Sequence, residues 1–189
     1  MSGDRRVRIL IGEQSIAQRV ETLAREIAAR KPEELLVVAI LKGSFMFAAD
    51  LIRALHRAGL EPQVEFMHLS SYLTGTVSTG QVKILRDIDS SVKGRDVLLI
   101  DDILESGRTL AFAKDLLTAR GAAHVMVAVM LEKPAKRAVQ IKADFIGFEC
   151  PDLFVVGYGM DVAHSYRQLP YIGVVDTSPD AQDDLPLIV

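Results

Sequence analysis

The chain has 189 residues, of which 49% are apolar and 25% are charged, and its formal net charge is −3 at pH 7. This composition is sufficient for one α/β domain over residues 1–189, and the negative charge argues against general nucleic-acid or anionic-membrane binding. The single cysteine, Cys150, excludes an intramolecular disulfide and a multi-cysteine zinc site, which fits a cytoplasmic protein. We expect no signal peptide and no membrane span, because the longest apolar run, residues 35–41, is too short to cross a bilayer.

The N-terminal third predicts a helix, a strand and a second helix. Apolar residues recur at helical spacing over Ser15–Arg30, and Ser15 itself fits the start of a capping box. Leu35–Leu41 is continuously apolar, which is typical of a strand buried on both faces of a parallel sheet. Phe45–Ala58 then predicts a helix that Gly59 ends, so this third has the opening pattern of a βαβ unit.

A polar run separates the next two predicted strands, Gln63–Ser70 and Val82–Arg86. The run, residues 70–80, is rich in hydroxyl side chains and contains two glycines. It is too long for a plain turn, so we expect either a mobile loop or a functional lid there.

The stretch from Val97 to Leu110 carries the densest chemical signal in the chain. Its apolar start, Val97–Ile100, predicts a buried strand, and two acids follow it directly. Ligands in open α/β sheets bind beyond the carboxyl ends of strands, and a helix start attracts phosphate. The segment Glu105–Thr109 leads into such a helix, predicted over Thr109–Arg120.

The last third predicts four short strands and a tail. The strands are His124–Leu131, Asp144–Phe148, Phe154–Val156 and Ile172–Val175. We expect the tail from Ser178 onward to be loosely ordered. The alternation of strands and helices over the whole chain predicts an α/β fold with a mostly parallel central sheet flanked by helices.

The order of residues from Val97 to Thr109 resembles the phosphoribosyl pyrophosphate (PRPP) signature of the type I phosphoribosyltransferases. The shared pattern is an apolar strand, two acids, two apolar residues, an acid and then Ser-Gly-X-Thr. The resemblance implies that Asp101 and Asp102 contact the ribose, directly or through metal-bound water. It implies that the 5′-phosphate binds to Glu105, Ser106, Gly107, Arg108 and Thr109. These residue types suit the task, since a glycine allows close backbone approach and hydroxyls and amides donate to phosphate.

Two further segments resemble the pyrophosphate-binding parts of the hypoxanthine-guanine phosphoribosyltransferases within this family. Leu41-Lys42-Gly43-Ser44 is similar to their pyrophosphate loop, which implies that Lys42 and Gly43 bind pyrophosphate. The peptide before this lysine is often cis in that family, and we therefore predict a cis bond between Leu41 and Lys42. The resemblance also assigns Arg167 to pyrophosphate and Asp161 to Mg²⁺, together with Asp101 and Asp102.

The C-terminal third resembles the purine-binding end of the same enzymes. By that match, Lys133 donates to the 6-oxo oxygen of the purine and Phe154 stacks on its ring. The backbone of Val155 meets the pyrimidine edge of the base. Ser71 and Tyr72 resemble the lid that closes over the site and excludes water.

One residue departs from the commonest family pattern. Where most members have Asp before the Thr/Ser-Gly pair, this chain has Glu105. In the family that acid lies beside purine N7 and is the proposed general base. The longer glutamate keeps the carboxylate and adds one methylene, so either its backbone lies slightly further from the ring or the base binds in a different position.

The resemblance implies the type I phosphoribosyltransferase fold with a small hood region and a mobile lid loop. It implies a Mg²⁺-dependent purine salvage enzyme that uses PRPP and a 6-oxopurine base, as a homodimer or homotetramer. Three alternatives stay open: a regulator on the same fold that binds RNA or DNA, a receiver-like signalling domain, and the same fold acting on another base such as xanthine.

Overall fold

The computed structural model describes residues 7–74, 77–175 and 188, and of residues 71–81 it describes the backbone alone. The elements are β1 (Val7–Ile11), α1 (Glu13–Ala29), β2 (Leu36–Leu41), α2 (Phe45–Arg57), β3 (Gln63–Thr74), β4 (Val77–Arg86), β5 (Asp96–Leu104), α3 (Arg108–Ala119), β6 (His124–Glu132), the 3₁₀ turn η1 (Pro134–Lys136), β7 (Phe145–Glu149), β8 (Val155–Val156) and β9 (Ile172–Val175). Among the described residues, no helix is long and apolar enough to cross a membrane.

A six-stranded sheet in the order β4-β3-β2-β5-β6-β7 forms the centre of the molecule. All its strands are parallel except β4, which pairs antiparallel with β3 at one edge. β2 and β5 lie in the middle of the sheet, so both faces of each are covered; β2 is apolar throughout, and β5 is apolar over Val97–Ile100. The predicted mostly parallel α/β fold is confirmed.

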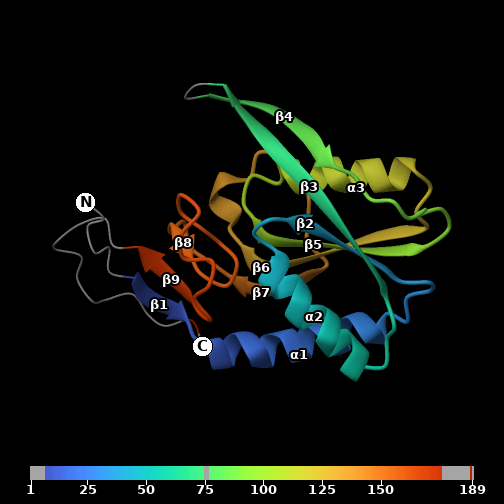
Figure 1. The fold of residues 1–189 in the computed structure, drawn as a ribbon, viewed down its shortest axis with the longest axis horizontal. Coiled ribbons are helices and arrows are strands. Elements are labelled where there is room, and N and C mark those ends of the chain that lie inside the picture. Colours follow the sequence, from blue (N-terminus) through green and yellow to red (C-terminus); the bar gives the residue numbers. More distant parts are fainter. Residues whose placement is uncertain (1–6, 75–76, 176–187, 189) are drawn as a thin grey trace.

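The helices cover the two faces of this sheet, with α1 and α2 on one side and α3 on the other (Figure 1). Alternate side chains of β5 point to opposite faces of the sheet, so they pack into the two helix layers in turn. Leu98 and Ile100 join the core beneath α1 and α2, whereas Leu99 packs with Leu110 and Leu117 of α3. The carboxyl ends of β2 and β5 are therefore held side by side on a rigid support.

A second sheet, in the order β1-β9-β8, lies beside the α1 and α2 layer and is antiparallel throughout (Figure 1). We call this sheet the hood. Its side chains, such as Val155 and Ile172, join the same core cluster as α1 and α2. Strand β1 was not predicted, while β9 was predicted with its observed bounds. The predicted loose tail lies outside the described residues except for Ile188, whose amide donates to the carbonyl of Leu10 at 2.9 Å.

The polar run at residues 70–80 contains strand where we predicted a loop. β3 continues to Thr74 and β4 begins at Val77, so the two strands form a long arm (Figure 1). Their backbones pair from His68–Arg86 to Thr74–Val77, with two irregularities in the register. The side chains of Ser71 and Tyr72 lie outside the described part, and their role as a lid stays a prediction.

Two helix and strand boundaries also differ from expectation. α1 begins after Gly12, so Ser15 lies inside the helix and does not cap it. β5 runs on to Leu104, so Asp101 and Asp102 belong to the strand itself and do not follow it.

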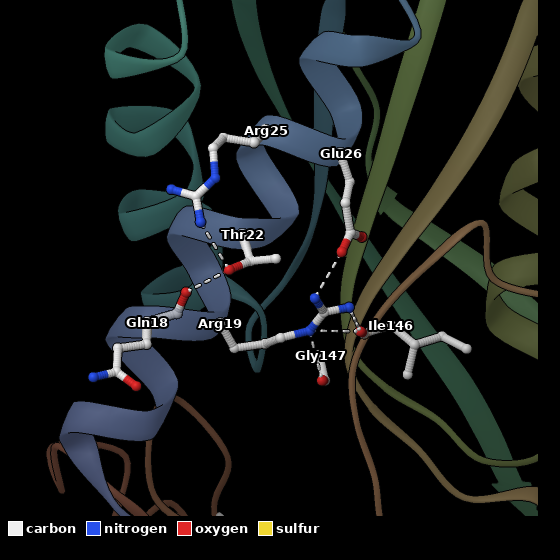
Figure 2. A network of polar contacts seen from close by, with 7 residues as sticks. All are labelled: Gln18, Arg19, Thr22, Arg25, Glu26, Ile146 and Gly147. Atoms are coloured by element: carbon white, nitrogen blue, oxygen red, sulfur yellow. Dashed lines mark hydrogen bonds and ion pairs between the residues drawn. The ribbon is translucent and has the colours of Figure 1, made fainter.

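Strand β7 forms the far edge of the large sheet, and Arg19 of α1 covers part of that edge (Figure 2). The Arg19 guanidinium donates to the carbonyl of Ile146 at 2.6 Å from Nη2 and to that of Gly147 at 3.0 Å from Nε. Its Nη1 also pairs with Glu26 at 2.8 Å. These contacts fill carbonyl acceptors that an edge strand leaves open, and they fasten α1 to β7.

Candidate active site

A cavity of about 300 Å³ lies at the carboxyl ends of β2 and β5. It forms where β5 separates from β2, since their paired register ends at Ile100 while β5 continues beside β6 to Leu104. The sequence-predicted residues in its lining are Lys42, Gly43, Asp101, Asp102, Glu105, Ser106, Gly107 and Thr109. The predicted pyrophosphate loop, acid pair and phosphate loop (residues 105–109) therefore share one space.

The two acids stand side by side on β5 and both line this cavity. Asp101 is 8% exposed, and its Oδ1 accepts the amide of Asp102 at 3.0 Å. Asp102 Oδ1 in turn accepts the amide of Ile103 at 3.0 Å. Each carboxylate is thus oriented by a backbone donor from the residue that follows it.

Burial perturbs both carboxyl groups. Loss of solvation raises the pKa of Asp101 well above its usual range, and the charge of Asp102 raises it further. Burial also raises the pKa of Asp102, while its hydrogen bond with Asp101 and the nearby Arg167 charge act to lower it. A pair of this kind is stabilised by a cation that shares the space, and this is a property expected of a metal- or sugar-binding acid pair.

The loop after β2 packs tightly against the acids. The peptide bond between Leu41 and Lys42 is cis, as predicted. A Cβ at Gly43 would lie 1.8 Å from Asp102 Oδ2, so a side chain there would displace either the loop or the Asp102 carboxylate. A Cβ at Gly159 would lie 2.2 Å from the carbonyl oxygen of Gly43, so the turn between β8 and β9 closes over the other side of this loop.

The phosphate loop leads directly into α3. Gly107 has φ +81°, a backbone conformation that glycine adopts most easily, and α3 begins at the next residue. The amides at such a helix start point outward without intrahelical acceptors, and with the hydroxyls of Ser106 and Thr109 they are donors of the kind that suit an anion.

Lys133 lies next to the phosphate loop and is buried, with 6% exposure. Its Nζ donates to the carbonyl of Leu153 at 2.6 Å and lies 3.7 Å from Glu105 Oε1. Phe154 follows Leu153 and is 57% exposed, and Val155 is buried in β8. Of the residues predicted to bind a purine, Lys133 therefore lies next to Glu105, and its hydrogen bond to Leu153 ties it to the segment just before Phe154 and Val155.

Asp161 and Arg167 form a separate cluster in the turn between β8 and β9. Arg167 Nη2 pairs with Asp161 Oδ1 at 2.7 Å, and its Nη1 donates to the carbonyl of Gly159 at 2.6 Å. Asp161 Oδ2 accepts the amide of His164 at 2.7 Å. Neither side chain is part of the lining of the 300 Å³ cavity. The cluster is connected to the cavity through Gly159, which Arg167 contacts and which packs against Gly43 in the cavity lining.

Within the described part of the chain, no group of three or more His, Cys, Asp or Glu could hold a metal ion by itself. Asp101 and Asp102 nevertheless suit Mg²⁺, a hard cation that takes one or two carboxylates and completes its shell with phosphate oxygens and water. The acid pair thus fits a metal that binds together with a phosphorylated ligand.

Sequence reasoning missed two contributors to this region. The carbonyl of Leu153 anchors Lys133, and no side-chain motif marks a backbone oxygen. Arg137 packs against Gly107 behind the phosphate loop, and in the sequence it is simply one of several basic residues after β6.

Comparison with known proteins gives a consistent result along the chain. Residues 10–163 match the phosphoribosyl transferase domain family. The chain is 45% identical over 169 residues to the hypoxanthine-guanine phosphoribosyltransferase of Bacillus subtilis (strain 168), covering 89% of this chain and 92% of that protein. It is 46% identical over 172 residues to the bifunctional protein TilS/HprT of Listeria innocua, but it spans only 26% of that longer protein.

Solved structures agree with the sequence matches. A hypoxanthine-guanine phosphoribosyltransferase from Bacillus anthracis has a TM-score of 0.84 and 40% identity, covering 90% of this chain and 100% of that one. A hypoxanthine phosphoribosyltransferase in which an invariant aspartic acid is changed to glutamic acid has a TM-score of 0.85 and 36% identity, covering 92% and 96%.

Proposed function

Because this chain belongs to the phosphoribosyltransferase family, we propose that it transfers ribose 5-phosphate from PRPP to N9 of hypoxanthine and of guanine. The products are IMP or GMP and pyrophosphate, and the reaction depends on Mg²⁺. One observation carries this proposal. The acid pair and both predicted phosphate-binding loops share one cavity, and Lys133 lies 3.7 Å from Glu105 at its edge.

Three groups hold PRPP in this proposal. The phosphate loop takes the 5′-phosphate on its amides and hydroxyls, and its fixed place before α3 sets the position of the sugar. Asp101 and Asp102 accept from the ribose hydroxyls and fix the sugar's orientation. Lys42, Gly43 and Arg167 contact the pyrophosphate, with the Arg167 guanidinium already oriented by Asp161 and Gly159.

Mg²⁺, when bound, neutralises charge that develops on the pyrophosphate leaving group. Asp101 and Asp102 would hold it together with ligand oxygens, and Asp161 is a third proposed ligand. The buried acid pair supports this, because a divalent cation offsets the repulsion between the two carboxylates.

The purine ring lies between Phe154 and the phosphate loop. Lys133 donates to the 6-oxo oxygen, and its buried ammonium cannot accept the amino group that adenine carries at the same position. The carbonyl of Leu153 holds the ammonium, which supports a fixed donor. Glu105 takes or shares the N7/N9 proton, and Val155 contributes its backbone to the pyrimidine edge of the base.

The experiment that tests this proposal is a transferase assay with PRPP and Mg²⁺ against hypoxanthine, guanine, xanthine and adenine in parallel. We expect turnover of hypoxanthine and guanine and none of adenine. Turnover of xanthine alone would assign the chain to another base, and no turnover of any purine would contradict the proposal.

The resemblance also supports proposals about cellular location and assembly. We propose that the protein works in the cytoplasm and assembles as a homodimer or homotetramer. Gel filtration with light scattering tests the assembly, and a monomer at micromolar concentration would contradict it.

A further inference from the structure

The chain that follows β6 wraps around the back of the phosphate loop. The amides of Ala138 and Val139 both donate to the carbonyl of Ser106, at 2.9 and 3.1 Å. A Cβ at Gly107 would lie 2.7 Å from Ile141 Cγ2 and 3.1 Å from the Val139 carbonyl oxygen. The loop therefore depends on this segment for its shape as well as on its own sequence.

Arg137 is the charged residue at the centre of this contact. Its Nη2 donates to Glu132 Oε1 at 2.9 Å, and the two side chains are only 19% and 20% exposed. Its Cδ lies 3.5 Å from the position a Cβ would take at Gly107. The guanidinium is thus anchored to the last residue of β6 while the aliphatic stem packs against the loop.

The second terminal nitrogen of the same guanidinium is unusual. Arg137 Nη1 is buried and has no hydrogen-bond partner within the part of the chain that the structure describes. A buried donor without an acceptor costs free energy, so its retention calls for a physical reason. Because the Cδ of the same side chain packs against Gly107 of the phosphate loop, an oxygen of the loop or of an anion bound there could supply the missing acceptor.

We propose that Arg137 is a positioning residue for the 5′-phosphate site: it holds the Ser106–Gly107 backbone in its phosphate-binding conformation and donates Nη1 when an anion fills the loop. This inference rests on the proposed function, which assigns the 5′-phosphate to that loop. A residue that only stabilises the fold would affect every ligand through a general loss of folded protein. A positioning residue affects the 5′-phosphate and spares the pyrophosphate.

The test compares Arg137→Met, which keeps most of the stem and removes the charge, with Arg137→Lys, which keeps the charge but has one terminal nitrogen and so cannot occupy the positions of both Nη1 and Nη2. Arg120→Met is the matched control, because Arg120 pairs with Asp87 at the far end of α3 in a contact of similar chemistry. Calorimetry measures the dissociation constants of ribose 5-phosphate and of Mg²⁺-pyrophosphate separately for each folded variant. Steady-state kinetics then give KM for PRPP, KM for hypoxanthine and kcat.

For Arg137→Met we expect the dissociation constant of ribose 5-phosphate to rise about tenfold, which is a loss of about 1.4 kcal/mol. Arg137→Lys should lie between this variant and the natural protein. Pyrophosphate binding and KM for hypoxanthine should stay within about twofold, and Arg120→Met should leave all the constants unchanged.

Three results would overturn the proposal. Unchanged ribose 5-phosphate binding in Arg137→Met, or an equal loss for ribose 5-phosphate and pyrophosphate, would reduce Arg137 to a structural role. If Arg137→Met does not fold, the same comparison is made on Arg137→Lys. If the natural protein binds pyrophosphate but no ribose 5-phosphate, the loop assignment itself fails and this inference fails with it.

Discussion

Glu105 is the first residue of the phosphate loop and lies 3.7 Å from Lys133, so at the scale of single residues it gives the most direct test of the proposed chemistry. We predict that Glu105→Gln lowers kcat by about 10²-fold or more, because the amide cannot take a proton from the purine. KM for PRPP should change little, since the amides and hydroxyls of the loop remain. Steady-state kinetics check this, and near-normal kcat would remove Glu105 from proton transfer.

Glu105→Asp is the informative partner of that variant. It restores the residue that the family pattern commonly has, and it shortens the reach toward Lys133, now 3.7 Å away. We expect Glu105→Asp to keep a kcat well above that of Glu105→Gln. An equal loss in both variants would contradict this and show that a carboxylate at position 105 is not sufficient without the length of the glutamate side chain.

The buried acid pair gives a prediction about stability. The raised pKa of Asp101 means that the native state holds more protons than the unfolded chain, so the stability contributed by this group falls as pH rises above its ordinary value of 3.8. Asp101→Asn removes this cost, and without ligands we expect it to be more stable at pH 7 by about 1–2 kcal/mol, at the expense of activity. Its advantage should shrink toward zero as the pH falls to about 4.

Asp87→Asn is a control of opposite sign. Its hydrogen bond with Arg120 lowers the pKa of Asp87, so the natural residue stabilises the protein above its ordinary pKa and loses that effect in acid. The pair is more than a third exposed, so its loss should cost under about 1 kcal/mol at pH 7. Denaturant titrations at several pH values check both variants, and an Asp101→Asn protein that is less stable at pH 7 would contradict the account.

At the scale of elements, the attachment of α1 to the edge strand β7 can be tested with a single substitution. Arg19→Met removes the hydrogen bonds to the Ile146 and Gly147 carbonyls, and we expect a loss of about 1.5–3 kcal/mol in the free energy of unfolding. Arg25→Met on the same helix is the control, since Arg25 donates an exposed hydrogen bond to the Thr22 hydroxyl. Equal losses in the two variants, measured by urea unfolding, would show that the edge contact contributes nothing special.

The pyrophosphate loop depends on the absence of a side chain at Gly43. A methyl group there would overlap Asp102, 1.8 Å from its Oδ2, so either the loop or the acid must move. We predict that Gly43→Ala raises KM for PRPP by about tenfold or more while the protein stays folded. Gly12→Ala is the control, because nothing lies within 4 Å of a Cβ at Gly12. An unchanged KM in Gly43→Ala would contradict the tight packing of this loop.

The central elements could be predicted because their signals are local. Leu35–Leu41 is apolar at every position because β2 is buried on both faces, and Gly107 marks a turn that needs a positive φ. β1 could not be predicted in the same way, since it is defined by pairing with β9 at the other end of the sequence. The polar stretch after Ser70 resembles a loop in composition, and only its pairing with β4 makes it a strand.

In the candidate site, too, the features with local sequence signals could be predicted, and those set by pairing between distant segments could not. The order of Asp101, Asp102 and Glu105–Thr109 along one strand and turn was sufficient to predict that the acids and this segment lie together at one end of the sheet, and most of these residues line one cavity. The position of Lys133 beside Glu105 arises because β5 and β6 are parallel neighbours, with Leu104 paired to Glu132. The sequence motif was sufficient to single out Lys133, but its position beside the phosphate loop follows from the pairing of β5 with β6. The same pairing places Arg137 next to the phosphate loop, although no motif marks Arg137.

At the scale of the whole molecule, the fold brings together three parts of the chain that are far apart in sequence. β2 leads into the predicted pyrophosphate loop, β5 and the start of α3 carry the acids and the predicted phosphate loop, and the segment between β7 and β9 carries Phe154 and Arg167. The family match rules out the receiver-like alternative. The alternative of a nucleic-acid-binding regulator finds no support in the net charge of −3.

The central claim is that PRPP and a 6-oxopurine occupy one shared pocket, and a crystal structure of the protein with IMP bound tests it most directly. The account predicts that the 5′-phosphate lies on the amides of the loop from Ser106 to Thr109 and that O6 of the base is within hydrogen-bond distance of Lys133 Nζ. An IMP molecule with its phosphate outside that loop, or with its base away from Lys133 and Phe154, would contradict it.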